Sequence, residues 1–351
     1  MFEDMAVETE TQVLKEAKYY EVLDQGRVHC YLCPKHCKIW QGLAGFCFIR
    51  KNIGGKLYSL GYGRPAAVNI DPIEKKPLFH FLPGTRILSM GTAGCNMGCK
   101  FCQNWDISKA KADQVHSRFL SPEAVVEAAV QYRCPSIAFT YNEPTIFAEY
   151  VVDTAMVARE RGVRTVMVTN GYITAEARRE VYRWIDAANV DLKGFTREFY
   201  RKITLSTLEP VLETLCDLQE MGIWIEITNL MIPGQNDSEE ETWSMCRWIV
   251  EHLGEQVPVH FTAFHPDFKM TQVPHTPETT LRRAREIALE SGIQFVYEGN
   301  VFSEEGSNTY CPRCHRLLIR RSWHQVVDNG LCKGNQCSCG EIIPMGALLS
   351  A

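Results

Sequence analysis

The sequence predicts an α/β fold in which parallel strands are joined by helical crossovers. Helical stretches separate the strand-like runs from residue 86 to residue 300, and several begin with a capping signal, as at Ser121, Ser238 and Thr276. Strands and helices that alternate about every thirty residues indicate parallel strands. An incomplete (β/α) barrel and a doubly wound sheet both fit this period. The seven expected strands are Arg86–Met90, Ser136–Thr140, Val163–Thr169, Ala188–Leu192, Ile223–Leu230, Val257–Phe264 and Ile293–Tyr297.

Polar residues gather where five of these strands end. Both candidate architectures bind ligands at the carboxyl ends of parallel strands. A single polar residue there usually caps a helix or faces water, but five loops that all carry such groups indicate a shared site. The segments concerned are Thr140–Thr145, Thr169–Gly171, Asp191–Gly194, Glu226–Asp237 and Phe264–Pro266.

The loop after the first expected strand carries three cysteines, Cys95, Cys99 and Cys102, at C-x3-C-x2-C spacing. A [4Fe–4S] cluster usually has four cysteine ligands, and zinc ribbons use two separated pairs. Three thiolates would leave one iron open, able to bind a small chelating ligand and to pass it an electron. The alternatives are a chance trio of buried thiols and half of a zinc site.

Cys95, Cys99, Phe101 and Cys102 resemble the cluster motif of radical S-adenosylmethionine (SAM) enzymes. The run from Ile70 to Gly84, with the Cys-Gln-Asn-Trp ending of the cysteine loop, resembles more specifically the AmmeMemoRadiSam system radical SAM enzymes. Those are relatives of the pyruvate formate-lyase activating enzyme. The resemblance implies a partial (β/α)6-type barrel, a [4Fe–4S] cluster and SAM as cofactors.

The resemblance also implies how SAM is held. The amino and carboxylate groups of SAM would chelate the open iron, and Glu143 would accept a hydrogen bond from the SAM ammonium. Tyr141 and Asn142 stand where the family has two glycines. No residue of the chain is expected to act as an acid or a base. The residues expected to contact the cofactors are Phe101, Asn142, Glu143, Thr169, Asn170, Asp191, Lys193 and His265.

Four further cysteines, Cys30, Cys33, Cys37 and Cys47, lie within eighteen residues near the start of the chain. Four thiols at this spacing would complete a tetrahedral zinc site or hold an auxiliary cluster. Zinc is preferred because closed four-thiolate sites of this size commonly hold it. Unligated thiols are a weaker alternative.

The last fifty residues predict a zinc-ribbon-like module. A C-x2-C pair at Cys311 and Cys314 is followed by a hairpin pattern and a second group of thiols. The second group departs from the usual C-x2-C, so the remaining ligands are open among Cys332, Cys337 and Cys339. Zinc is preferred over an empty site, and a second cluster is less favoured. Such a module would act as a lid or a docking surface.

The composition excludes several classes of protein. The 351 residues carry a net charge of −5, which gives no reason to expect a nucleic-acid or anionic-membrane partner. No apolar run reaches membrane-spanning length and the start is acidic, so we expect a cytoplasmic protein. Twelve of the fifteen cysteines fall into three groups, which indicates metal sites in a reducing compartment.

Three regions are expected. Residues 1–84 form an N-terminal extension with the Cys-rich module and a lead-in, residues 85–300 the barrel, and residues 301–351 the ribbon-like tail. A weak helical pattern covers residues 1–29, and the isolated Cys134, Cys216 and Cys246 are expected to be small core residues.

The favoured function is a radical SAM oxidoreductase, activase-like, that abstracts hydrogen from a protein or a small molecule. A one-electron donor such as flavodoxin or ferredoxin would serve it. The alternatives are modification of a metabolite or of a side chain other than glycine, and an iron–sulfur sensor or electron carrier that uses no SAM. A zinc-dependent nucleic-acid-binding protein is disfavoured by the charge.

Overall fold

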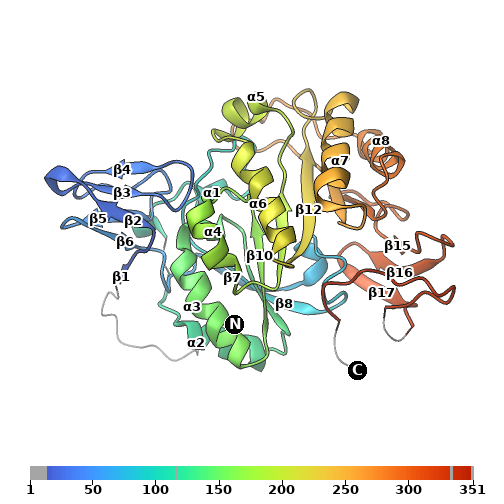
Figure 1. Ribbon diagram of the computed structural model, residues 1–351, viewed down its shortest axis with the longest axis horizontal. Helices are drawn as coiled ribbons and strands as arrows, with labels where there is room; N and C mark the ends of the chain where they lie inside the picture. The colour runs from blue at the N-terminus through green and yellow to red at the C-terminus, as the bar shows by residue number, and fades with distance from the viewer. Residues whose placement is uncertain (1–13, 116, 333–334, 349–351) are drawn as a thin grey trace.

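The computed structural model describes residues 14–115, 117–332 and 335–348. An eight-stranded sheet forms the centre of the molecule, and its strands follow one another in the order β14-β13-β12-β11-β10-β9-β8-β7 (Figure 1). The strands are β7 (Ala67–Pro72), β8 (Arg86–Gly91), β9 (Ser136–Phe139), β10 (Arg164–Thr169), β11 (Ala187–Asp191), β12 (Trp224–Met231), β13 (Val259–Ala263) and β14 (Val296–Gly299).

The order of the strands decides between the two predicted architectures. Every neighbouring pair from β8 to β14 is parallel, and the spatial order never reverses. A doubly wound sheet reverses its order at a switch point, whereas a (β/α) barrel does not. The predicted fold class, a partial (β/α) barrel, is therefore confirmed. One departure is β7, where the expected lead-in adds an antiparallel edge strand to β8.

Helices cover the outside of this sheet. Ser121 and Ser238 cap the first and fifth main helices as predicted, each through its side-chain oxygen at 3.2 Å from a backbone N–H. Thr276 does not cap the last helix. Its hydroxyl instead bridges Phe264 N and Met231 O, which ties two strand ends together. The main helices are α2 (Pro122–Gln131), α3 (Ala148–Glu160), α4 (Ala175–Tyr182), α6 (Glu209–Glu220), α7 (Glu239–Leu253) and α8 (Glu278–Glu290).

Short helical turns sit in the loops between these elements. At the end of the barrel that carries Cys95, Cys99 and Cys102, they include α1 and the adjoining α5 and η5, which follow β11. Their bounds are η1 (Asp24–Gly26), η2 (Ile73–Lys75), α1 (Trp105–Ser108), η3 (Ala112–Gln114), η4 (Pro144–Phe147), α5 (Arg197–Phe199) and η5 (Tyr200–Thr204).

The N-terminal segment forms two small antiparallel sheets rather than the helix expected there. Residues 1–13 lie outside the described part of the chain, but residues 14–30 contain strands and one short turn. Tyr20 and Val28 are drawn into pairing with neighbouring strands, which overrides the weak helical pattern. The sheets are β1 (Lys15–Glu16) with β6 (Lys56–Ser59) and β5 (Arg50–Ile53), and β2 (Tyr20–Val22) with β3 (Val28–Cys30) and β4 (Cys37–Ile39).

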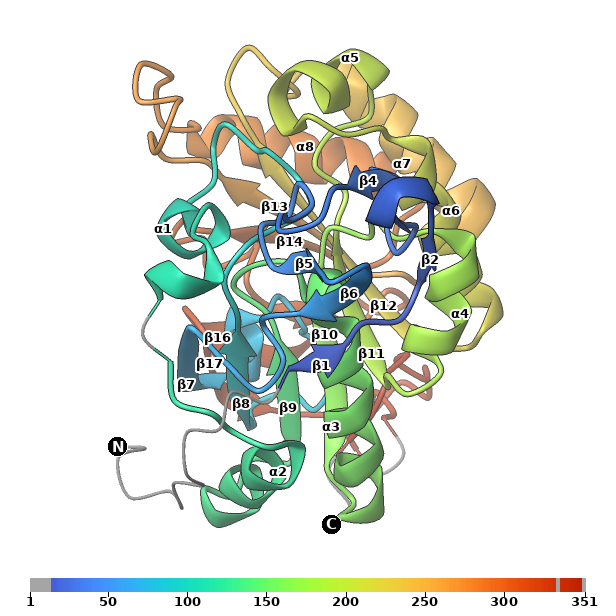
Figure 2. The same ribbon diagram turned by 90° about the vertical axis from the view of Figure 1, so that its left-hand side faces the viewer.

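A third small sheet closes the chain, and it comprises β15 (Thr309–Tyr310), β16 (Leu317–Ser322) and β17 (Gln325–Asn329). Figure 1 shows the N-terminal sheets and this sheet at opposite ends of the long axis, with the barrel between them. Seen from the N-terminal side, β1–β6 stand in front of the barrel strands (Figure 2). In the described residues, no helix combines the length and the apolar character needed to span a bilayer.

One buried arginine docks each end module onto the barrel. Arg50 of β5 forms an ion pair of 3.0 Å with Glu149 of α3, and both side chains are almost completely buried. Arg321 of β16 lies 4.2 Å over the ring of Phe79 and donates to its carbonyl oxygen at 2.8 Å. Each guanidinium thus fixes a module by contacts that only a planar, multiply donating cation can make.

Candidate active site

A cavity of about 560 Å³ opens at the carboxyl ends of the barrel strands. All seven parallel strands or the loops directly after them contribute to its wall, as expected for chemistry on this fold. The lining includes Cys95, Cys99, Cys102, Asn142, Glu143, Asn170, Asp191, Lys193, Thr228, His260 and Glu298.

The three cysteines of the loop after β8 form one wall of this cavity. Neighbouring turns fix the loop, because Gly98 N donates to Thr204 O at 2.8 Å and Lys100 N to Ile203 O at 3.0 Å. Cys99 is buried, and burial raises the pKa of its thiol to about 11. Met97 N donates to Cys95 Sγ at 3.4 Å. Hydrogen bonds of this kind tune the potential of a bound iron–sulfur cluster.

Asn142 fixes the backbone at the start of the cysteine loop. Its Oδ1 accepts from Thr92 N at 3.1 Å, and its Nδ2 donates to Gly94 O at 2.9 Å. Gly91 allows this close approach, because a Cβ there would lie 2.3 Å from Thr140 O. Asn142 lines the cavity, but its amide is used to position the loop.

Glu143 joins the ends of β9 and β10. Its carboxylate accepts from Thr145 N at 2.9 Å, from Thr169 Oγ1 at 2.8 Å and from Asn170 N at 2.8 Å. Burial raises its pKa. Asn170 then reaches the cysteine loop through a bond of 2.9 Å from its Nδ2 to Asn96 Oδ1. Asn96 was not predicted as a site residue, although its position between Cys95 and Cys99 indicates that it lies in the cysteine loop.

Asp191 and Lys193 form an ion pair of 2.8 Å beside the cysteines. Burial acts to lower the pKa of Lys193, but the charges of Asp191 and Cys99 outweigh it and raise the pKa. The ammonium lies 5.7 Å from the ring centre of Phe101. These three residues and Cys99 therefore line the same part of the cavity; their contact with a cofactor stays a prediction.

His265 and Thr169 are the two expected cofactor contacts that do not line the cavity. The side chain of His265 is about half exposed, and its Nδ1 lies 2.9 Å from Gln103 Nε2. It therefore stands at the outer rim next to Cys102. Thr169 does not reach the cavity itself, but its hydroxyl donates a hydrogen bond to Glu143, which does.

Part of the cavity wall comes from residues that were not among the expected cofactor contacts. It comes from the segment before β8, from the ends of β13 and β14, and from the turn between β16 and β17. A period-2 signal was available, since Thr228 pairs with His260 and Leu230 with Thr262, and all four line the cavity. The residues of this wall include Lys75, Lys76, His260, Thr262, Glu298, Trp323 and His324.

A buried polar network lies beneath this wall. Glu226 accepts from His260 Nε2 at 2.7 Å and from His80 N at 2.8 Å. Burial acts to raise the pKa of Glu226, but its hydrogen bond and charge pairing with His260 lower it. His80 Nε2 lies 2.6 Å from the hydroxyl of Tyr297, and burial lowers the pKa of His80 to about 4. The imidazole is therefore neutral near pH 7 and joins the barrel floor to the C-terminal segment through Pro344 O.

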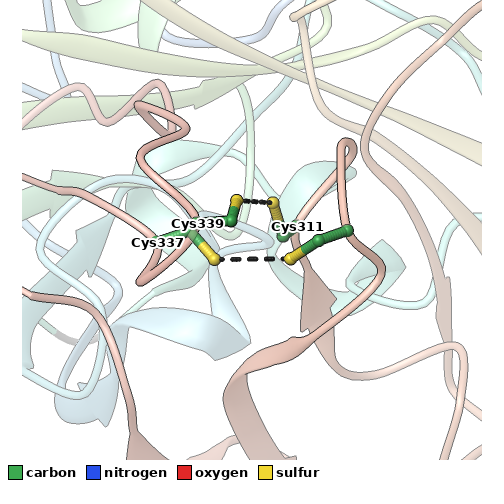
Figure 3. A group of neighbouring side chains, drawn as sticks. Cys311, Cys337 and Cys339 are labelled. Carbon is green, nitrogen blue, oxygen red and sulfur yellow. Dashed lines mark hydrogen bonds between the residues drawn. The ribbon is translucent and has the colours of Figure 1, made fainter.

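The C-terminal module brings four thiols together (Figure 3). Cys311 Sγ lies 3.6 Å from Cys339 Sγ, and Cys314 Sγ lies 3.6 Å from Cys337 Sγ. Four sulfurs around one zinc ion would be about 3.8 Å apart, given Zn–S bonds of about 2.3 Å. The geometry fits such an ion.

Cys332 lies outside this group, although the sequence left it open as a ligand. The C-x-C pair supplies both remaining thiols itself. Gly340 adopts φ +93° and its N–H closes a turn onto Cys337 O at 2.8 Å, so the two cysteines face the same side. Cys332 is exposed.

The N-terminal thiols behave differently. In the described part of the chain, only the C-terminal group brings three or more thiols within 4.8 Å of one another. Cys30 and Cys37 are register partners on β3 and β4, and Cys30 and Cys47 are buried. The four residues thus share a module without the tight spacing of the C-terminal group.

Comparison with known families gives a match that includes the cysteine loop. The model of the Radical SAM superfamily matches residues 90–246. An uncharacterized protein of Methanocaldococcus jannaschii is 48% identical over 332 residues, which are 94% of this chain and 99% of that protein. The pyruvate formate-lyase 1-activating enzyme of Escherichia coli is 22% identical over 237 residues, 61% of this chain and 93% of that enzyme.

A solved structure shares the fold. The crystal structure of a radical SAM methyltransferase from Sphaerobacter thermophilus superposes with a TM-score of 0.50 at 16% identity, over 63% of this chain and 68% of that one. At this identity the likeness concerns the fold alone.

Proposed function

We propose that the chain is a radical SAM enzyme that holds a [4Fe–4S] cluster at Cys95, Cys99 and Cys102 and cleaves SAM reductively, which the match of the Radical SAM superfamily model to residues 90–246 supports. Cluster and SAM together supply a 5′-deoxyadenosyl radical that abstracts hydrogen from a substrate. One observation carries the proposal. The three thiols line the same cavity as polar residues from the ends of the parallel strands. An electron carrier that binds no SAM would need no such cavity.

The donor set fits the cluster. Thiolates are the ligands that iron–sulfur clusters prefer, and three of them leave one iron for another ligand. Among the described residues that line the cavity, these three are the only cysteines. The half-buried Cys95 and Cys102 flank the buried Cys99 at the wall itself.

The surrounding residues orient SAM in this proposal. Glu143 receives two hydrogen bonds at Oε1 and one at Oε2, so Oε2 keeps an acceptor site for the SAM ammonium. Lys193 offers its ammonium to the carboxylate, and Asp191 holds it in place. Asn142 keeps the loop backbone rigid. His265, at the rim, serves the ribose side.

The substrate in this proposal lies between SAM and the part of the cavity wall that the C-terminal module supplies. Trp323 and His324 at the tip of the β16–β17 turn would cover it and limit access of water. We favour activase-like hydrogen abstraction from a protein or a small molecule, supported by the alignment with an activating enzyme over 93% of its length. Modification of a metabolite or of a side chain other than glycine is the second candidate. The closer resemblance, to the AmmeMemoRadiSam system enzymes, stays a prediction.

The experiment is anaerobic. The protein is reconstituted with iron and sulfide, reduced with dithionite in the presence of SAM, and assayed for 5′-deoxyadenosine and methionine. Wild type and Cys216→Ala, which alters a thiol outside the three groups, should both form them, whereas Cys99→Ala should not. A wild-type protein that assembles and reduces its cluster but neither binds nor cleaves SAM would contradict the proposal.

A further inference from the structure

We propose that Cys30, Cys33, Cys37 and Cys47 hold a second [4Fe–4S] cluster, which passes electrons to the cluster at Cys95, Cys99 and Cys102. The sequence alone favoured zinc for these four residues. The relay role rests on the proposed function, but the presence of the second cluster does not. Both can therefore be tested separately.

The β3–β4 hairpin directs the four thiols into one site. Cys30 and Cys37 are paired directly across the hairpin, so their side chains share a face. Cys33 lies in the connection between the two strands, and Cys47 follows in the next loop. Phe46 N donates to Cys37 Sγ at 3.5 Å, which brings the Cys47 segment against the hairpin. The same kind of N–H···S bond is present at Cys95.

The spacing of the thiols favours a cluster over a single ion. In the C-terminal group four thiols lie within 4.8 Å of one another, as one zinc ion requires. No three of the N-terminal four do so, and all four are among the described residues. The three cysteines at the active site, which are also described, do not all lie within 4.8 Å of one another either. Ligands of a [4Fe–4S] cluster must stand apart to admit its inorganic core.

The N-terminal site abuts the active-site loop. Gly94, which precedes Cys95, packs so closely on the segment of Cys47 that a Cβ there would lie 2.1 Å from Cys47 O. The contact therefore joins a ligand of one site to the neighbour of a ligand of the other. It provides a short path for an electron between the two sites.

A second contact links the turn between Cys33 and Cys37 to the active-site loop through Leu205. Lys35, between Cys33 and Cys37, donates through its Nζ to Leu205 O. The side chain of Leu205 in turn packs on Gly98, between Cys95 and Cys99, where a Cβ would lie 2.6 Å from it. A purely structural zinc module would not need both of its thiol-bearing loops at this position.

The relay transfers one electron for each SAM cleaved. The N-terminal cluster gives up one electron and returns to its oxidised form, and the active-site cluster takes it up and supplies it to the sulfonium. The carbon–sulfur bond then breaks into methionine and the 5′-deoxyadenosyl radical. A low-potential one-electron carrier protein, such as a ferredoxin or a flavodoxin, restores the N-terminal cluster.

The first test removes the active-site cluster. The variant Cys95→Ala/Cys99→Ala/Cys102→Ala is purified without oxygen and reconstituted, and its iron, sulfide, zinc and Mössbauer spectrum are measured. We expect about four iron and four sulfide per chain with the spectrum of a [4Fe–4S] cluster. Adding Cys33→Ala and Cys37→Ala should abolish them. About one zinc per chain belongs to the C-terminal thiols. About two zinc without iron, or no iron at all, would overturn the second cluster, whatever the wild type does with SAM.

The second test addresses the relay. SAM cleavage is measured with a reduced ferredoxin and, separately, with dithionite. In Cys33→Ala/Cys37→Ala the ratio of the two rates should fall roughly tenfold or more relative to wild type. Cys216→Ala should keep the wild-type ratio. Cleavage with dithionite also reports whether the double variant has folded. An unchanged ratio would overturn the relay while leaving the proposed function intact.

Discussion

The N-terminal and C-terminal modules both consist of small strands and grouped thiols, but their thiols are arranged differently. Each is a set of small antiparallel strands carrying four grouped thiols, and each docks through one buried arginine, Arg50 or Arg321. The C-terminal thiols converge tightly, and none of them lines the cavity. The N-terminal thiols are more widely spaced and abut the active-site loop. This difference supports our proposals that the N-terminal module supplies electrons and that the C-terminal module covers the substrate.

The largest expected effect concerns the C-terminal thiols. Cys311→Ala should abolish zinc binding and unfold the module, because structural zinc contributes about 10 kcal/mol or more to the folding of small modules. Zinc content and limited proteolysis would show this. The matched control is Cys332→Ala, which alters the exposed thiol outside the group and should keep zinc. Loss of zinc from the control would break the ligand assignment.

The second-largest expected effect concerns the ion pair that docks the N-terminal module on the barrel. Arg50→Met leaves Glu149 buried without its partner, and we expect a loss of about 3–5 kcal/mol in the free energy of unfolding. Lys18→Met, which removes an exposed pair with Glu180, should cost less than about 1 kcal/mol. Urea titrations would compare the two. Equal losses would mean that the Arg50 pair does not hold the module.

The C-terminal junction should be sensitive to pH. Burial lowers the pKa of His80 to about 4, so below the unfolded value of about 6.5 the unfolded state binds a proton that the folded state does not. Stability is therefore full above pH 6.5 and falls toward pH 4, by on the order of 3 kcal/mol. His80→Gln should flatten this slope in urea titrations at several pH values. An unchanged slope would remove His80 as its source.

The smallest effect tests the contact between the two cysteine loops. Gly94 and Gly162 both adopt positive φ, of +84° and +66°, but only a Cβ at Gly94 would collide with another segment. Gly162→Ala should cost about 1 kcal/mol for its backbone conformation, and Gly94→Ala at least about 1 kcal/mol more. Thermal melts would measure the difference. Equal costs would contradict close packing of Cys47 on the active-site loop.

Much of the fold could be predicted because its signals are local. The seven parallel strands followed from runs of apolar residues, and the polar residues at their ends marked the rim of the cavity. The antiparallel pairing of β7 with β8 was not predicted, because it depends on contacts that a propensity pattern does not contain. The N-terminal strands were mistaken for a helix for the same reason.

The candidate site was only partly predictable. Cys95, Glu143 and Lys193 could be predicted because each belongs to a motif that directly follows a strand, and all three line the cavity. Trp323 and His324 come from a module that is distant in sequence, and its docking on the barrel, to which Arg321 contributes, brings them to the cavity. Spacing along the chain could not separate zinc from a cluster, because that choice depends on the distances between sulfurs.

One measurement tests the central claim that the grouped thiols form two iron–sulfur sites and one zinc site. Iron, sulfide and zinc are counted in the wild-type protein after anaerobic purification and reconstitution. The account predicts about eight iron, about eight sulfide and about one zinc per chain. About four iron with about two zinc would show that the N-terminal module is a second zinc site, and it would contradict the difference between the two modules.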